Sequence, residues 1–123
     1  MKTIPHKNVM DSVFINHRTD VAIVATIPEA YGDNIIAIGR YYLDTKTNMA
    51  KVAFVVHDNW QNKRIGSFLL RHLANIARRN GIRGFTAEVL RSNRPMQRVF
   101  NKCDQSVVST PHDDVISYHI EFA

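Results

Sequence analysis

The sequence predicts an α/β (α+β) fold in which helices pack on a mixed, mostly antiparallel sheet. Three apolar runs rich in β-branched residues predict strands at Asp20–Ile27, Asn34–Asp44 and Ala50–Val56. The period then changes, because residues 65–80 carry apolar side chains at the spacing of an amphipathic helix. A strand pattern returns at residues 84–90, so the chain alternates the two element types that such a fold needs.

The first three strands differ in their expected surroundings. The run at Ala50–Val56 is almost continuously apolar, which predicts a central strand buried on both faces. Gly39 predicts a bulge in the strand before it. The strand at 84–90 must run parallel to the 50–56 strand if the intervening helix is a crossover.

The last third of the chain predicts one helix and a hairpin. Ser92–Pro95 provides a capping side chain and an early proline, so a second helix begins there and ends near Lys102. Strands at Gln105–Thr110 and Val115–Phe122 then form a hairpin around residues 111–114. No repeat or linker interrupts this order, which indicates a single domain over residues 1–123.

Composition excludes several classes of protein. The single cysteine, Cys103, rules out a disulfide framework and fits a reducing compartment, so we expect a cytoplasmic protein. No segment resembles a signal peptide, and no apolar run is long enough to cross a bilayer, so we expect no membrane partner. The six histidines show no metal-ligand spacing with each other or with Cys103, so we expect no metal.

Basic residues outnumber acidic ones 16 to 11, and the excess gathers in the middle of the chain. Residues 45–103 carry twelve Lys and Arg side chains and two acidic ones, so this part attracts anions. Nucleic acid, a polyphosphate ligand or an acidic partner would each fit. Nucleic acid is the least expected, because basic strands flanked by aromatic residues are lacking. For Arg71, Arg78 and Arg79 we expect a solvated helix face.

One loop, His57 to Ser67, carries the clearest chemical signal. It leads from a strand directly into the start of a helix, where unpaired backbone N–H groups and the helix dipole favour an anion. Lys63 and Arg64 add positive charge, and Gly66 permits close backbone approach. A phosphate-bearing ligand fits this loop. The alternative is a strand-to-helix turn in which a small residue serves packing alone.

Two motifs in this region resemble a known family. Val56-x-x-x-Trp60-Gln61-x-x-Arg64-Ile65-Gly66, with Asn93-x-x-Met96-x-x-x-Phe100 after it, resembles the acetyl-CoA-binding core of the GNAT N-acetyltransferases. Residues 52–90 and 93–103 are most similar to the GNAT domain of bacterial protein lysine acetyltransferases, including those fused to NDP-forming acyl-CoA synthetases. The resemblance spans roughly residues 20–103 and implies the GNAT acyl-CoA N-acyltransferase fold.

The resemblance implies acetyl-CoA as co-substrate. Backbone amides of residues 61–67 would hold the pyrophosphate, and the backbone of residues 54–56 would bind the pantetheine arm. One backbone N–H in the latter stretch would polarise the thioester carbonyl. Asn93 fits a place near the thiol and fits a helix N-cap equally well. The residues that the resemblance assigns to acetyl-CoA are Phe54, Val55, Val56, Gln61, Asn62, Lys63, Arg64, Ile65, Gly66, Ser67, Asn93, Met96 and Phe100.

The sequence departs from the family pattern at three positions of the site. Arg64 replaces the first signature glycine, and Phe100 stands where many members have a tyrosine general acid. Lys51 stands where the related branch has the glutamate general base. An acceptor lysine has a pKa near ~10.4 and needs such a base at neutral pH. The candidates are a neutralised Lys51, or Glu88 or His57 acting through water; alternatively, Lys51 pairs with an acid or extends into solvent.

The N-terminal part is the largest departure. Only 19 residues precede the first predicted strand, too few for the strand and two helices that the resemblance implies for one substrate wall. We therefore expect an N-terminally truncated fold whose acceptor groove is open or is completed by a second subunit. A homodimer is expected because the strand at Asp20–Ile27 would otherwise be an uncovered apolar edge.

Together these features predict an acetyl-CoA-dependent N-acetyltransferase. It would act by direct attack of an amine on the thioester in a ternary complex, and the acceptor would be a protein lysine or a small amine. The alternative is a catalytically weak or inactive CoA-binding regulatory module, which Lys51 and Phe100 favour.

Overall fold

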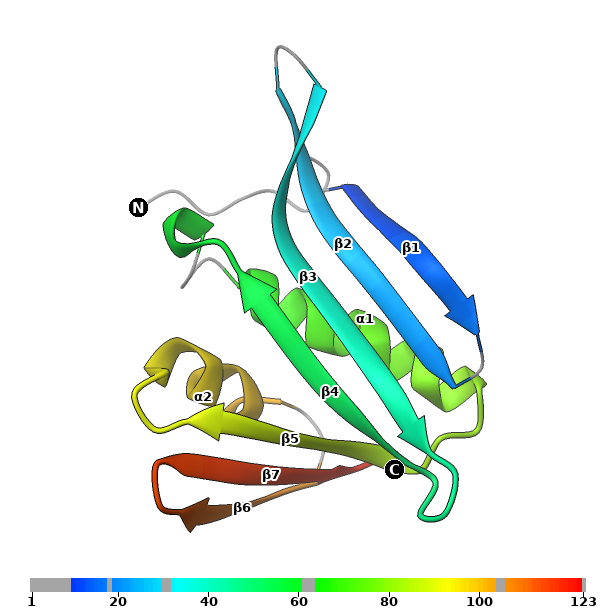
Figure 1. Cartoon of the computed structure of the whole chain (residues 1–123), viewed down its shortest axis with the longest axis vertical. Coiled ribbons are helices and arrows are strands. Elements are labelled where there is room, and N and C mark those ends of the chain that lie inside the picture. The colour runs from blue at the N-terminus through cyan, green and yellow to red at the C-terminus, as the bar shows by residue number, and fades with distance from the viewer. Residues whose placement is uncertain (1–9, 18, 30–31, 61–63, 104–105, 123) are drawn as a thin grey trace.

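The computed structural model describes residues 10–17, 19–29, 32–60, 64–103 and 106–122 (Figure 1). Its seven-stranded sheet has the strand order β1-β2-β3-β4-β5-β7-β6, and two α-helices pack on it. The strands are β1 (Met10–His17), β2 (Asp20–Glu29), β3 (Gly32–Asp44), β4 (Met49–Val56), β5 (Gly84–Leu90), β6 (Ser106–His112) and β7 (Val115–Glu121). The helices are α1 (Ile65–Arg79), α2 (Arg94–Asn101) and a short 3₁₀ turn at Asp58–Trp60.

The predicted fold class is confirmed, but one strand was missed. β1 pairs antiparallel with β2, from Met10 opposite Thr26 to His17 opposite Asp20. The expected uncovered edge at Asp20–Ile27 is therefore wrong, because β1 occupies it. The sequence of this segment carries little strand signal, because its three consecutive apolar residues, 13–15, lie among polar ones. β1 leads into β2 through residues 18–19, so no helix stands between these two strands.

The sheet consists of two antiparallel parts joined by a short parallel ladder. β1 to β4 form one part, and β5, β7 and β6 form the other. Between them only Met49, Ala50 and Lys51 of β4 pair with Gly84, Phe85 and Thr86 of β5. The predicted parallel arrangement is confirmed, and the two strands separate beyond the third pair.

Both helices cover the same face of the sheet. On α1 the buried residues Leu69, Leu73 and Ala77 follow the helical period and pack against the strands. A Cβ atom at Gly39 would come within 3.0 Å of the Phe54 ring, so the glycine makes room for packing. The predicted bulge does occur in β3, but at Ile36 and not at Gly39, because Ala37 pairs with Ala25 and Ile35 pairs with Thr26.

The second helix is anchored through an aromatic stack. Phe100 is 1% exposed, and its ring centroid lies 5.0 Å from Tyr118 of β7 and 6.0 Å from Phe54 of β4. Burial raises the pKa of the Tyr118 hydroxyl above its ordinary value. The stack connects α2 to strands of both parts of the sheet.

The opposite face, here called the outer face, carries no helix among the described residues. β4 alternates along its length: Val52 is buried, whereas Lys51, Ala53 and Val55 are exposed. Val55 is 70% exposed, so the prediction that this strand is buried on both faces is wrong. The apolar side chains of β4 point to both faces of the sheet, and the described helices cover only one of these faces.

The C-terminal hairpin differs from its prediction in the turn. β6 continues to His112, and the turn contains only Asp113 and Asp114. Pro111 is accommodated within a strand because β6 lies at the edge of the sheet, where no further strand requires its missing N–H. Asp113 has a φ of 53°, a left-handed conformation that Asp tolerates in turns.

Neither described helix combines the length and the apolar character needed to cross a bilayer.

Candidate functional site

A cleft opens on the helix-bearing face where β4 and β5 separate. Its volume is about 1000 Å³, and it is bounded by β4, the start of α1 and one side of α2. Among the residues predicted to bind the ligand, the cleft is lined by Phe54, Val55, Val56, Arg64, Ile65, Gly66, Ser67, Asn93 and Met96. The structure thus brings together side chains from three elements that are separate in the sequence. Gln61, Asn62 and Lys63 lie outside the described residues.

The start of α1 has an unusual backbone conformation. Arg64 is the N-cap residue, with φ 67° and ψ 12°, and its side chain makes no capping hydrogen bond. This left-handed region costs an ordinary residue about 1–2 kcal/mol and favours glycine. The first turn contains no acidic residue, so no carboxylate of the helix itself competes for its free N–H groups.

Gly66 serves packing between the helices. A Cβ atom there would lie 2.9 Å from Cγ2 of Val99 on α2. The alternative stated for this glycine, a small residue required for packing, is therefore supported by the geometry. Because α2 approaches α1 at this point, the start of α1 and the flank of α2 form two walls of one cleft.

Positive charge dominates the cleft walls. Four cationic residues line it, against one carboxylate, Asp58. Arg71 is exposed, as expected of a solvated helix face, and it also lines the cleft wall, two turns after Arg64. The seven-residue spacing, which keeps two side chains on one helix face, was the signal in the sequence. The four cations are Arg64, Arg71, Arg98 and Lys102.

The first residues of α2 shape the end of the cleft. The Met96 backbone N–H donates to Oδ1 of Asn93 at 3.3 Å, so Asn93 caps the helix as the sequence allowed. Asn93 and Met96 also line the cleft. Phe100 does not, because it is buried in the aromatic stack with Tyr118. Its predicted contact with the ligand is therefore not supported.

Two of the three candidate proton acceptors lie on the outer face. Lys51 and Thr86 are register partners, and Glu88 follows Thr86 on the same face. Lys51 belongs to the last β4–β5 pair, and Glu88 lies two residues beyond that pair on β5, where the two strands separate. Both side chains are exposed, and neither makes an ion pair within the described residues.

The third candidate, His57, faces its own turn. Its Nδ1 atom accepts a hydrogen bond from the Asn59 backbone N–H at 3.2 Å. His57 also lies outside the cleft lining, unlike Asp58 and Trp60 beside it. Glu88 lies outside this lining as well, so the difference is that Nδ1 of His57 already accepts a hydrogen bond, whereas the Glu88 carboxylate makes no ion pair within the described residues. This difference favours Glu88 over His57 as a proton acceptor.

A linked set of charged groups on the outer face escaped the sequence analysis. Glu121 accepts hydrogen bonds from Arg83 and lies 3.1 Å from Nε2 of His119. The hydrogen bonds from Arg83, followed by the contact with His119, hold the pKa of Glu121 below its ordinary value. His119 is the register partner of Thr86, so it stands two strands away from Lys51 on this face, with β5 between them. Its alternation with Glu121 along one strand was the available signal.

The described residues contain no group of three or more His, Cys, Asp or Glu side chains that could hold a metal ion.

The sheet opens between two parallel strands beside a helix start that is lined with cations, an arrangement suited to a phosphate-bearing ligand. The chain belongs to the Acetyltransferase (GNAT) family, whose profile matches residues 5–104. Proteins of this family use acetyl-CoA as co-substrate.

Three relatives show the extent of the similarity. The chain is 36% identical over 69 residues to the acetyltransferase Pat of Mycolicibacterium smegmatis, covering 55% of this chain and 21% of that protein. It is 29% identical over 83 residues to the acetyltransferase PA5475 of Pseudomonas aeruginosa, covering 68% and 45%. The crystal structure of the GNAT domain of S. lividans PAT superposes with a TM-score of 0.73 at 33% identity, covering 89% of this chain and 65% of that one. The chain thus spans less than half the length of the two curated relatives.

The left-handed conformation of Arg64 leads to a prediction. Replacing Arg64 with glycine removes the steric cost at φ 67°, so we expect Arg64→Gly to raise the free energy of unfolding by up to about 1 kcal/mol. Urea denaturation measures the change. Arg79→Gly is the control, because Arg79 is an exposed helical residue in the last turn of α1, where glycine relieves no left-handed backbone and costs up to about 1 kcal/mol. A loss of stability in both variants would contradict the conformational argument.

Proposed function

We propose that the chain is an acetyl-CoA-dependent N-acetyltransferase that acts by direct attack of an amine in a ternary complex. The observation that carries this proposal is the cationic cleft between β4, α1 and α2, which opens where β4 and β5 separate. Family membership and the acetyltransferase names of the relatives support the same class of reaction.

The charge of the cleft and the free backbone of β4 support acetyl-CoA as its ligand. Free N–H groups at the start of α1, with Arg64 and Arg71 beside them, suit the pyrophosphate. Beyond Lys51 the ladder to β5 ends, so the β4 backbone at residues 54–56 can bind the extended pantetheine arm. Arg98 and Lys102 add positive charge on the α2 side, near the remaining phosphate.

The proposed reaction is one acyl transfer. The acceptor nitrogen forms a bond with the thioester carbonyl carbon, the carbon–sulfur bond breaks, and the CoA thiolate leaves. A backbone N–H within residues 54–56 stabilises the negative charge that develops on the carbonyl oxygen. The acceptor nitrogen loses one proton, and a thiolate is a tolerable leaving group without the tyrosine that Phe100 replaces.

We assign proton removal to Glu88. Its carboxylate is exposed on β5, two residues beyond the last β4–β5 pair, and so stands beside the opening between the strands. The acceptor would approach from the outer face, where Glu88 and Lys51 both lie. Because no helix covers this face among the described residues, it admits a protein lysine or a small amine.

The second candidate function is a CoA-binding regulatory module with weak or no catalysis. Lys51 in place of the usual base favours it, because a positioned base typically contributes ~10² to 10⁴ in rate. Acetyl-CoA would bind equally in both cases, so product formation from acetyl-CoA and a panel of amines separates them.

Binding of acetyl-CoA should depend on the charge at position 64. We expect Arg64→Glu to weaken it about tenfold or more, since a repulsive carboxylate would replace a cation at the start of α1. Isothermal titration calorimetry gives the affinity. Arg79→Glu is the matched control, because Arg79 is exposed at the far end of the same helix and does not line the cleft. Equal effects of the two reversals would place the ligand elsewhere.

Catalysis should depend on Glu88 in a pH-dependent way. We expect Glu88→Gln to lower kcat/KM at pH 7 by ~10²-fold and to leave acetyl-CoA affinity unchanged, since Glu88 lies outside the cleft lining. The deficit should shrink as pH approaches the pKa of the acceptor amine, because the free amine no longer needs a base. Asp44→Asn, at the far end of β3, is the control.

Lys51→Glu then tests the position that the family uses. In the Glu88→Gln background we expect it to restore neutral-pH activity by about tenfold, because a carboxylate returns to the same face. If Lys51→Glu alone instead lowers activity, Lys51 has a function of its own, such as holding an acidic acceptor.

We also expect a homodimer in the cytoplasm. The edge originally expected to pair is covered by β1, and the support now comes from the outer face, where Ile38, Val55 and Leu90 are exposed. Sedimentation equilibrium at micromolar concentration tests this, and a monomer would contradict it. The single thiol, Cys103, suits a reducing compartment.

A further inference from the structure

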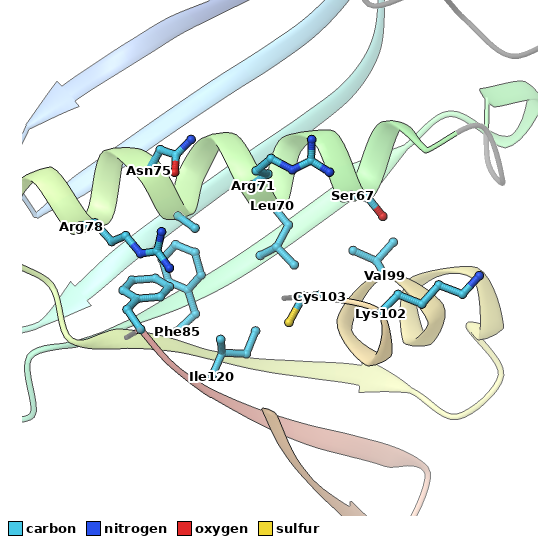
Figure 2. A pocket seen from close by; sticks show the side chains of 12 residues that line it. Ser67, Leu70, Arg71, Asn75, Arg78, Phe85, Val99, Lys102, Cys103 and Ile120 are labelled. Carbon is cyan, nitrogen blue, oxygen red and sulfur yellow. The ribbon is translucent and has the colours of Figure 1, made fainter. Parts of the chain in front are cut away.

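A second pocket, of about 280 Å³, lies on the helix-bearing face between α1, the end of α2 and the strands β5 and β7 (Figure 2). Its volume is close to the lower end of the ~300–1,000 Å³ range of small-molecule sites. Phe85 of β5 and Ile120 of β7 form its floor, and Leu70 projects into it from α1. The inner part of the pocket is therefore apolar.

The rim of the pocket is polar and positively charged. Three polar side chains of α1 line the rim, namely Arg71, Asn75 and Arg78. They follow one another at helical spacing and lie farther from the sheet than the buried Leu70 and Ala74. Arg78 is held over the Phe122 ring, with its guanidinium carbon 5.3 Å from the ring centroid. No carboxylate is found among the described residues that line the pocket. Because seven residues of helix span about 10 Å, Arg71 and Arg78 lie at different ends of this rim. An anion beside Arg78 would contact that guanidinium group directly and would be attracted by Arg71 from a distance.

The opposite wall comes from the end of α2, where Lys102 and Cys103 line the pocket. Figure 2 shows the Cys103 sulfur between Leu70 and Ile120, so the chain's single thiol reports on the inner part of the pocket. Ser67, Arg71, Val99 and Lys102 line both this pocket and the acetyl-CoA cleft. The same residues of α1 and of the α2 region thus separate the two cavities and line both of them.

We propose that this pocket is a separate binding site for a small carboxylate with a short apolar tail. The tail would occupy the space above Phe85 and Ile120, and the carboxylate would bind at the rim beside Arg78. A guanidinium group offers two parallel N–H donors that match a carboxylate. The apolar floor disfavours a polyanion, since further charges would be buried without partners.

The shared wall couples this site to the cofactor cleft. A carboxylate in the pocket adds negative charge near Arg71 and Lys102, which line both cavities, and so weakens the attraction of these cations for the phosphates of acetyl-CoA. Each ligand should therefore weaken binding of the other, and linkage requires the same factor in both directions.

Alkylation of Cys103 tests the proposal with hexanoate as the probe. Iodoacetamide, which is uncharged, reacts with the thiol, and the rate is measured against hexanoate concentration. We expect saturable protection: at ten times the half-protecting concentration the rate falls about tenfold, because only the unoccupied fraction reacts. Hexylamine should give no protection, since it carries the tail without the negative charge.

Three variants locate the effect. Arg78→Ala should raise the half-protecting concentration about tenfold, whereas the neighbouring Arg79→Ala should not change it, because Arg79 does not line the pocket. Asn75→Trp adds a ring to an exposed rim position, so it should slow alkylation without hexanoate and abolish further protection. Equal protection by hexylamine, or equal effects of Arg78→Ala and Arg79→Ala, would overturn the proposal. Equal protection by inorganic phosphate would reduce the pocket to an adventitious ion site only.

The Arg64→Glu variant separates this site from the acetyl-CoA cleft. We expect hexanoate to protect Cys103 in that variant as in the wild-type protein, because Arg64 lines only the cleft. Loss of protection would mean that hexanoate acts in the cleft, which overturns a separate site. If Arg64→Glu leaves acetyl-CoA binding intact while hexanoate still protects, the cofactor assignment fails and the pocket stands.

Discussion

Hydrogen bonding between β4 and β5 stops after Lys51 and Thr86, and the rest of the site follows from where it stops. A longer ladder would pair the β4 backbone with β5 and leave no strand free to bind an extended ligand. Phe54 lies three residues past the last pair, and its ring contacts Phe100 of α2. That contact places α2 against the separated strands, and Gly66 lets the same helix approach the start of α1. One short ladder therefore positions three walls of the cleft.

The charge pattern has a structural counterpart. The basic middle of the chain contains β4, both helices and β5, so folding collects like charges around one cavity. Arg64, Arg71 and Lys102 make no ion pair within the described residues. Such a group repels itself until an anion binds, and ligand binding then stabilises the folded state. In the acidic C-terminal part, by contrast, Glu121 forms an ion pair with Arg83.

Local periodicity predicted the elements with strong patterns, and tertiary context decided the others. α1 and β5 lie where their apolar spacing placed them, because each buries a continuous stripe. β1 was missed because three apolar residues carry little signal without knowledge of the β2 edge that they pair with. The exposure of Val55 could not be foreseen, since a run of apolar residues does not reveal that one face lacks a cover. The left-handed conformation of Arg64 could not be predicted, because arginine rarely adopts it.

For the site, the sequence motif indicated the cleft. The choice of Glu88 over His57 required knowledge of the strand faces and of the contact between His57 and Asn59.

The uncovered outer face has a calorimetric consequence. The heat capacity increase on unfolding comes from newly exposed apolar surface, about 12–15 cal/mol/K per residue in ordinary globular domains. Ile38, Val55 and Leu90 are already in contact with water in the folded chain and contribute less than buried residues would. The stability curve of this chain is accordingly flatter with temperature than that of a sheet covered on both faces. A surface that docks on the outer face would restore part of the missing heat capacity and sharpen the thermal transition.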